Sequence, residues 1–200
     1  AQGLPVRTNT RWPTLTPEDL IVVPGWRSPT LATTFKLTEK TLNRLRTHHA
    51  TGGMVASICA GADALGKAGL LNGRRCTTHH DLQDELATRY PQATVVRDVL
   101  YVVDGQIATS AGIASGIDLA LHLVATKHGP ATAAKIARSM VVYARRNGDE
   151  DQESAMLRHR SHVDETVHKI QDHIDTHFTT PLRLSTLANK AGVSPRTVTR

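Results

Sequence analysis

The stretch MVASICAGAD, Met54–Asp63, decides how the rest of the chain can be arranged. It begins with a short apolar run, which is typical of a strand buried on both faces of a parallel sheet. Cys59 follows, and then Ala60, Gly61 and a helix-forming segment. Small residues around a cysteine allow a strained strand-to-helix turn in which larger side chains would collide with the sheet. The stretch therefore predicts a nucleophile elbow.

Strand and helix patterns alternate on both sides of this elbow. The run LIVVPGW, Leu20–Trp26, reads as another buried strand, and a leucine-spaced helix pattern then ends at Gly52-Gly53. Alternation of this kind predicts a doubly wound α/β sandwich. Asp104-Gly105 lies between two β-rich runs and predicts an antiparallel hairpin within that fold.

The composition changes at Asn147. Residues 147–161 are polar and begin with Asn-Gly, which is typical of a linker. An amphipathic helix pattern follows, with apolar residues at Val163, Val167, Ile170, Ile174 and Phe178. We therefore expect an α/β domain over residues 1–146, a linker over 147–161 and a small all-α domain over 162–200.

The last segment has the spacing of a helix-turn-helix. Ala188 is small enough for a second helix to pass close by, and Gly192 suits the turn. Ser194 and Pro195 suit the start of the next helix, and no acidic residue follows Asp175. A helical hairpin that contacts only protein has the same spacing, but the acid-free tail favours DNA. The residues expected to contact double-stranded DNA are Ser194, Arg196, Thr197, Thr199 and Arg200.

Composition limits the class of protein. The 200 residues are 40% hydrophobic with a formal charge of +6, and no apolar run is long enough to span a bilayer. Cys59 and Cys76 are too few for a disulfide framework. We expect a cytoplasmic protein without a membrane partner.

The chemistry of Cys59 is open between three interpretations: a nucleophile, a ligand-sensing residue and a small buried side chain. A following helix N-terminus would lower the pKa of its thiol, and His79 or His80 could reach it as a base. Asp63, Asp81 and Asp118 are more simply surface or helix-capping residues. His173 and His177 lie one helical turn apart but have no evident third ligand, so we expect neither a metal nor another cofactor.

Several of these segments together resemble one family. They are DLIVVPGW, SICAGADALGKAGLLNGRRCTTHH, VLYVVDGQIATSAGIASGIDLALHLV and IARSMVV. They are similar, in this order, to the class I glutamine amidotransferase-like (PfpI-type) domain at the N-terminus of certain AraC-type bacterial transcription regulators. The segment IQDHIDTHFTTPLRLSTLANKAGVSPRTVTR resembles the start of the AraC-type DNA-binding domain.

The resemblance implies a flavodoxin-like α/β fold and a chain that lacks both ends of the family pattern, namely an N-terminal strand region and a second helix-turn-helix. The family's elbow cysteine falls on Cys59 and its histidine on His79. The implied ligand pocket comprises Gly25, Trp26, Ala60, Gly61, His80, Ser110, Ala111 and Gly112. His80 departs from the pattern, because an aromatic residue, usually Trp, is expected there.

The resemblance also implies a function. In such regulators the cysteine domain is thought to sense a small nitrogenous metabolite or to dimerise, and hydrolysis is generally not established. We therefore expect a homodimeric, promoter-binding transcription regulator with a sensory cysteine. The alternative is a cysteine-dependent enzyme of the amidase, isonitrile hydratase or glyoxalase type that uses Cys59 and His79.

Overall fold

The computed structural model describes residues 11–26, 30–31, 37–153 and 164–199, and it divides into two compact units. The first unit is Ala1–Gln152 and the second is Glu153–Arg200. Residues 147–152, which the sequence assigns to the linker, hydrogen-bond with the first unit: the backbone N–H of Leu100 donates to the carbonyl of Gly148 at 2.8 Å. Among the described residues, no helix is long and apolar enough to cross a membrane.

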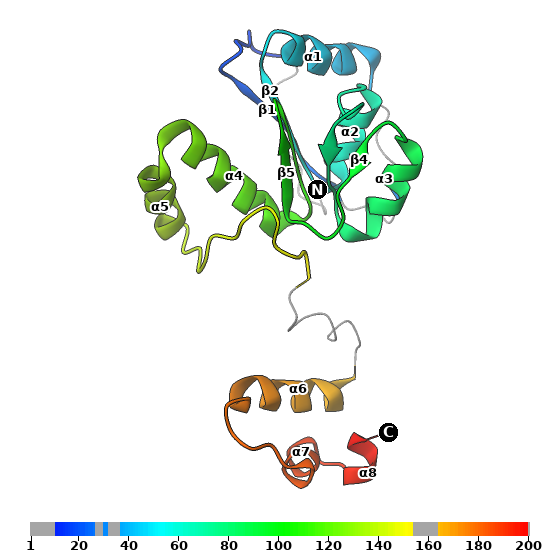
Figure 1. Ribbon diagram of the computed structural model, residues 1–200, viewed down its shortest axis with the longest axis vertical. Helices are drawn as coiled ribbons and strands as arrows, with labels where there is room; N and C mark the ends of the chain where they lie inside the picture. The colour runs from blue at the N-terminus through cyan, green and yellow to red at the C-terminus, as the bar shows by residue number, and fades with distance from the viewer. Residues whose placement is uncertain (1–10, 27–29, 32–36, 154–163, 200) are drawn as a thin grey trace. The chain divides into compact units, whose positions relative to one another are not determined.

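A four-stranded sheet forms the centre of the first unit, in the order β1-β2-β6-β5 (Figure 1). Its strands are β1 (Leu20–Val23), β2 (Met54–Ile58), β5 (Tyr101–Asp104) and β6 (Ile107–Ser110). β1, β2 and β6 pair in parallel, whereas β5 pairs antiparallel with β6. Gly105, with φ of +59°, occupies the turn between β5 and β6, which confirms the predicted hairpin. A separate two-stranded parallel sheet contains β3 (Arg75–Cys76) and β4 (Thr94–Val95).

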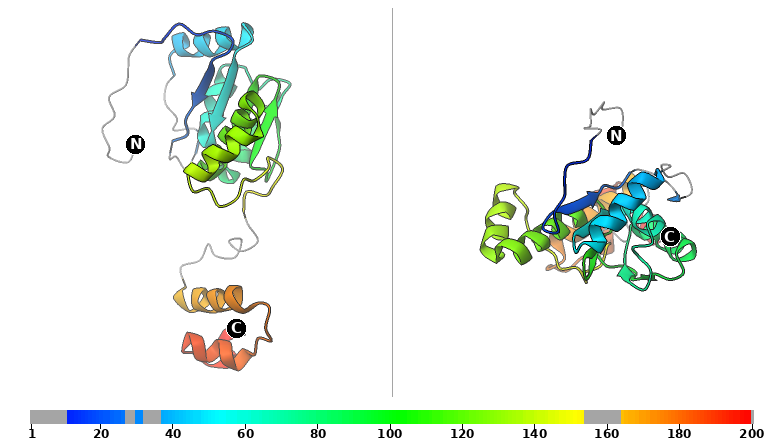
Figure 2. Two further views of the ribbon diagram at one scale, coloured as in Figure 1. Left: turned by 90° about the vertical axis from the view of Figure 1, so that its left-hand side faces the viewer. Right: turned by 90° about the horizontal axis from the view of Figure 1, so that it is seen from above.

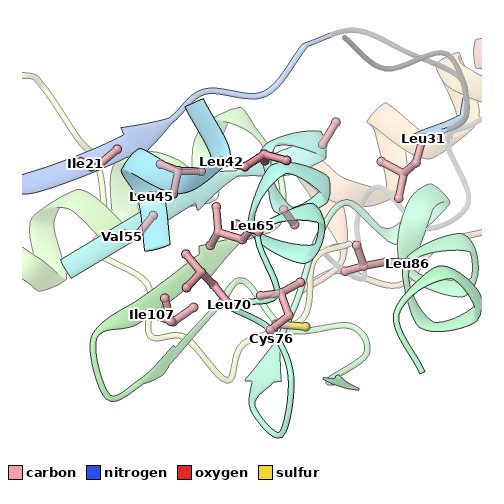
Figure 3. Packing of buried hydrophobic residues seen from close by; sticks show 14 of the residues in the cluster. Ile21, Leu31, Leu42, Leu45, Val55, Leu65, Leu70, Cys76, Leu86 and Ile107 are labelled. Atoms are coloured by element: carbon pink, nitrogen blue, oxygen red, sulfur yellow. The ribbon is translucent and has the colours of Figure 1, made fainter. Parts of the chain in front are cut away.

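Helices cover both faces of the sheet because alternate strand residues are apolar on each face. Val55 and Ile107 face a core shared with α1 (Glu39–Ala50), α2 (Ala62–Lys67) and α3 (Gln83–Arg89). Figure 3 shows side chains from these strands and helices meeting in that core, with the Cys76 sulfur among them. Cys76 is therefore a packing residue.

The opposite face carries a smaller core. Ala56 and Ala108 pack with Leu119 of α4 (Ile113–His128), which lies on the side of the sheet that is turned toward the viewer in the left view of Figure 2. α5 (Pro130–Ser139) follows directly and packs against α4. The observed arrangement is a mixed α/β sheet with helices on both faces, and the strand order places the ends of β1, β2 and β6 side by side.

Three helices make up the described part of the second unit. They are α6 (Glu165–His177), α7 (Leu184–Ala191) and α8 (Pro195–Val198). α6 begins where the Asp164 carboxylate accepts hydrogen bonds from the backbone N–H groups of Thr166 and Val167. The predicted helix is present and α7 packs against it, but no residue of α6 is buried, and Val167 and Phe178 of the apolar stripe are exposed. Val163, the first residue of that pattern, and residues 154–161 of the predicted linker lie outside the described residues.

Candidate ligand site at the Cys59 turn

Cys59 occupies a strained turn directly after β2. Its φ of +54° lies in the left-handed region, where residues with a side chain are uncommon. The 3₁₀ helix η2 (Cys59–Gly61) then leads without a break into α2. The Thr78 hydroxyl donates a 2.8 Å hydrogen bond to the carbonyl oxygen of Cys59 and holds this conformation from a neighbouring loop. The backbone thus has the sharp strand-to-helix turn that the small residues predict.

The small residues are required by close backbone packing. A Cβ on Gly61 would lie 2.5 Å from the carbonyl oxygen of Val23. A Cβ on Gly25 would lie 2.7 Å from the carbonyl oxygen of Ile58 and 2.8 Å from the Cβ of Cys59. The loop after β1 therefore presses directly on the turn, and the Gly25 position contacts Cys59 itself.

The environment of the Cys59 thiol does not favour its ionisation. The side chain is half-buried, and burial is the main cause that raises the pKa of the thiol. A backbone hydrogen bond with Ala60 partly offsets burial, whereas the nearby Asp81 carboxylate raises the pKa further. The lowered pKa expected from the helix N-terminus is therefore wrong. Burial and the Asp81 charge both favour the neutral thiol, and α2 is only six residues long.

His79 lies near the turn but is engaged elsewhere. Its Nδ1 accepts a 3.3 Å hydrogen bond from the backbone N–H of Asp81, and its ring stacks on His80 with centroids 4.2 Å apart. Burial, followed by the proximity of His80, lowers the pKa of His79, and Asp81 opposes that shift. Between these described residues, no hydrogen bond joins His79 to the Cys59 sulfur. The structure therefore brings the two residues into one region without forming a nucleophile–base pair.

The other predicted pocket residues fall into two groups. Side chains that are buried, and so cannot be reached from solvent, belong to Ala60, Ser110 and Ala111, and Gly61 is buried as well. Trp26 and Gly112 are half-buried, while Gly25 and His80 are exposed. A Cβ on Gly112 would lie 3.9 Å from Cδ2 of His79, so this loop lies beside the histidine. The accessible part of the region consists of Gly25, Trp26, Cys59, His79, His80 and Gly112.

Two of the three aspartates considered above are buried in ion pairs. The Asp63 carboxylate contacts Lys67 Nζ at 2.7 Å, Arg89 Nη1 at 3.2 Å and the Tyr90 hydroxyl at 2.7 Å. The Asp118 carboxylate accepts two hydrogen bonds from the Arg146 guanidinium at 3.0 and 2.7 Å. The expectation that both are surface or helix-capping residues is wrong, because Arg89 and Arg146, which pair with them, come from distant segments that a local pattern does not reveal. Asp81 is exposed, as expected.

Sequence reasoning missed the contribution of Thr78 and Gln152. Gln152 Nε2 donates to the carbonyl oxygens of Thr78 and Val99, both at 3.0 Å. Gln152, at the end of the first unit, thus hydrogen-bonds to Thr78, whose hydroxyl donates to the Cys59 carbonyl. No signal in the sequence identifies this contact, because the two residues lie 74 positions apart.

An apolar groove lies elsewhere, between the sheet and α4. It encloses about 280 Å³ and is lined on the strand side by Leu20, Val22, Ala56 and Ile58. Gly116, Leu119 and Leu123 line the helix side. Its lining carries few polar groups, and it includes none of the residues predicted to form the ligand pocket.

In the second unit, α7 and α8 are joined by a tight turn. Gly192 has φ of +70°, and the backbone N–H of Val193 donates to the carbonyl oxygen of Ala188 at 3.0 Å. The Ser194 hydroxyl accepts a hydrogen bond from the backbone N–H of Thr197 at 3.2 Å and caps α8. Ala188 is buried at the crossing. The predicted DNA-contacting residues Ser194, Arg196, Thr197 and Thr199 are exposed, and Arg200 lies outside the described residues.

A model of the DJ-1/PfpI family matches residues 1–126. The chain is 29% identical over 200 residues to the HTH-type transcriptional regulator CdhR of Pseudomonas aeruginosa, which covers 100% of this chain and 58% of that protein. It is 37% identical over 136 residues to an isonitrile hydratase of Pseudomonas putida, covering 66% of this chain and 55% of that enzyme. The chain thus spans little more than half the length of either relative.

Solved structures give similar matches. An AraC family transcriptional regulator from Pseudomonas putida aligns with a TM-score of 0.51 and 27% identity, over 61% of this chain and 63% of that chain. A mutant of a DJ-1 superfamily protein from Salmonella typhimurium aligns with a TM-score of 0.50 and 29% identity, over the same shares of the two chains.

Proposed function

The chain belongs to the DJ-1/PfpI family, and on this premise we propose that it is a DNA-binding transcription regulator of the AraC type. In this proposal the α/β unit senses a small effector, such as a nitrogen-containing metabolite, at the Cys59 turn, and the second unit binds promoter DNA as a homodimer in the cytoplasm. The match to CdhR supports this, because it extends through the second unit to the end of the chain. Of the four similar proteins named above, two are regulators, one is an enzyme and one is a DJ-1 superfamily protein.

The observation that carries the proposal is the turn between α7 and α8. A left-handed Gly192, a buried Ala188 and a serine cap are the parts of a helix-turn-helix, which holds its second helix in the major groove. α8 then presents Arg196 and Thr197 on an exposed face, and the tail around it is free of acidic residues. Cationic and hydroxyl side chains at this position can contact base edges and phosphates.

The test is DNA selection followed by footprinting with the full-length protein. We expect a defined operator sequence to be protected, with affinity that falls steeply as salt increases. Arg196→Ala should reduce discrimination between operator and mutated operator by about 1–3 kcal/mol, if it contacts a base. Lys169→Ala on α6 removes the same charge from an exposed position outside α8 and should leave discrimination unchanged. Equal protection of all sequences would overturn the proposal.

A second candidate function is a cysteine-dependent hydrolase or hydratase. The left-handed Cys59 and the similarity to an isonitrile hydratase favour it. The raised thiol pKa and the engagement of His79 Nδ1 by Asp81 weigh against it, because catalysis needs a thiolate and a free base. The thiol titration given in the Discussion separates the two candidates.

A further inference from the structure

His79, His80 and Asp81 place three metal-binding groups together beside the Cys59 turn. One donor atom from each side chain lies within 4.8 Å of the other two. His79 Nδ1 lies 3.4 Å and His80 Nδ1 lies 3.0 Å from oxygens of the Asp81 carboxylate. Two ring nitrogens thus converge on one carboxylate.

Local structure produces this convergence. His79 is extended, with φ of −54° and ψ of 139°, and the 3₁₀ helix η3 (His80–Leu82) begins at the next residue. The change in direction brings the two imidazole rings into contact and turns Asp81 back toward both of them. Consecutive residues in a continuous strand would instead point to opposite faces.

Buried residues on both sides hold the three groups in place. Thr77 and Thr78 are fully buried before them, and Leu82 and Gln83 are buried after them. Gln83 Nε2 donates to Thr77 Oγ1 and to the carbonyl oxygen of Thr78, both at 3.3 Å, and so closes the loop across its base. The donors are therefore accessible groups on a fixed backbone, which lowers the entropy lost when they bind an ion.

We propose that His79, His80 and Asp81 form a binding site for a divalent transition-metal ion, with Zn²⁺ as the reference ion. Two imidazoles and one carboxylate are a donor set that zinc accepts, and three protein ligands leave the fourth position open to solvent or to a small molecule. Bonds of about 2.0–2.1 Å in a tetrahedron separate neighbouring ligand atoms by about 3.4 Å. Each imidazole nitrogen lies about that far from one carboxylate oxygen, His79 Nδ1 at 3.4 Å from Oδ2 and His80 Nδ1 at 3.0 Å from Oδ1, and one donor atom from each residue lies within 4.8 Å of the others, so small side-chain rotations would complete the set.

An ion bound at His79 Nδ1 would displace the 3.3 Å contact with the Asp81 N–H, which is long for a hydrogen bond. The sequence pattern predicted no metal because the pair His173 and His177 has no evident third ligand, whereas this donor set depends on the turn at His79.

The experiment titrates metal-free, full-length protein with Zn²⁺ alone by calorimetry, and repeats the titration with Co²⁺ to record the absorption of the bound ion. We expect one equivalent to bind at this site with a tetrahedral Co²⁺ spectrum. His80→Gln and Asp81→Asn should each weaken the affinity for Zn²⁺ by about 100-fold or more. Even the loss of a group that only orients a metal ligand costs about 10–100-fold in metal affinity. Both residues are exposed, so the variants should fold normally, as circular dichroism can verify.

His177→Gln is the matched control. His173 and His177 stack on one face of α6 with centroids 4.2 Å apart and offer a second pair of adjacent imidazoles. The control should leave the affinity and the Co²⁺ spectrum unchanged. Binding that survives both His80→Gln and Asp81→Asn, or that is lost in His177→Gln, would overturn the proposal. The titration uses no DNA, so its outcome is separate from that of the regulator proposal.

Discussion

At the scale of single residues, Cys59 has the backbone conformation of a nucleophile elbow, but its surroundings raise the pKa of its thiol. The left-handed turn presents the thiol at the end of β2, as an elbow does. Burial and the Asp81 carboxylate nevertheless favour the neutral thiol. A sensor needs a positioned side chain but no thiolate, so this combination is consistent with ligand binding without turnover.

We expect the rate of Cys59 alkylation to show a titration midpoint above the ordinary thiol value of about 8.5. The raised pKa reduces the thiolate fraction at neutral pH, so modification should be slow there and accelerate only at alkaline pH. The measurement is alkylation rate against pH in the presence of a chelator, followed by mass spectrometry.

Cys59→Ser supplies the control for this titration, because it leaves only Cys76. That thiol is fully buried, and burial raises its pKa to about 11, so the variant should hardly react while folded. A midpoint for Cys59 below about 8.5 would instead support the hydrolase candidate.

At the scale of elements, the site depends on how closely β1, β2 and α2 approach one another. Gly61 lies against the carbonyl oxygen of Val23, and Gly25 lies against Ile58 and Cys59. Backbone atoms cannot move aside as a flexible side chain can, so neither position has room for a methyl group. The glycines therefore set the distance between the first loop and the cysteine.

Gly61→Ala should reduce the free energy of unfolding by about 1–3 kcal/mol, the usual cost of forcing an extra carbon into a packed site. Gly112→Ala is the control, because its nearest neighbour would be 3.9 Å away and its φ is −110°. Gly112→Ala should reduce the free energy of unfolding by about 1 kcal/mol or less, which is the usual effect of alanine at a helix N-cap. Denaturant unfolding measures both, and equal losses would contradict the packing argument.

At the scale of the whole molecule, the chain consists of two units with separate sets of contacts. The first has its own sheet and two cores, whereas the described part of the second has three helices and one fully buried hydrophobic residue, Ala188. A unit of this size has little buried surface to stabilise it. We expect the two to differ in stability.

Calorimetric unfolding of the whole chain should show two transitions. Ala188→Leu overfills the crossing of α7 with its neighbours and should lower only the transition of the second unit, by about 1–3 kcal/mol. Gly61→Ala should lower only the transition of the first unit. A single transition that both variants shift would show instead that the units unfold together.

Local patterns predicted much of this fold. The strand at Met54–Ile58, the hairpin at Gly105 and the amphipathic α6 each follow from side-chain periodicity or turn chemistry within a short window. The turn at Cys59 was also predictable, because small glycine and alanine neighbours after an apolar run allow a tight strand-to-helix junction. Asp63 and Asp118 were misjudged because each is paired in its buried position with an arginine far away in the chain, Arg89 and Arg146.

The sequence by itself determined the order of strands and helices, the position of the elbow and the capped turn at Gly192, since each depends on neighbours within a few residues. Only the tertiary structure decided the state of the site. The thiol pKa depends on burial and on Asp81, a residue far along the chain from Cys59, and the orientation of His79 depends on the turn that begins η3. Electrostatic energies depend on distances in space and on the exclusion of water, and neither quantity follows from the residues next to a group in the sequence.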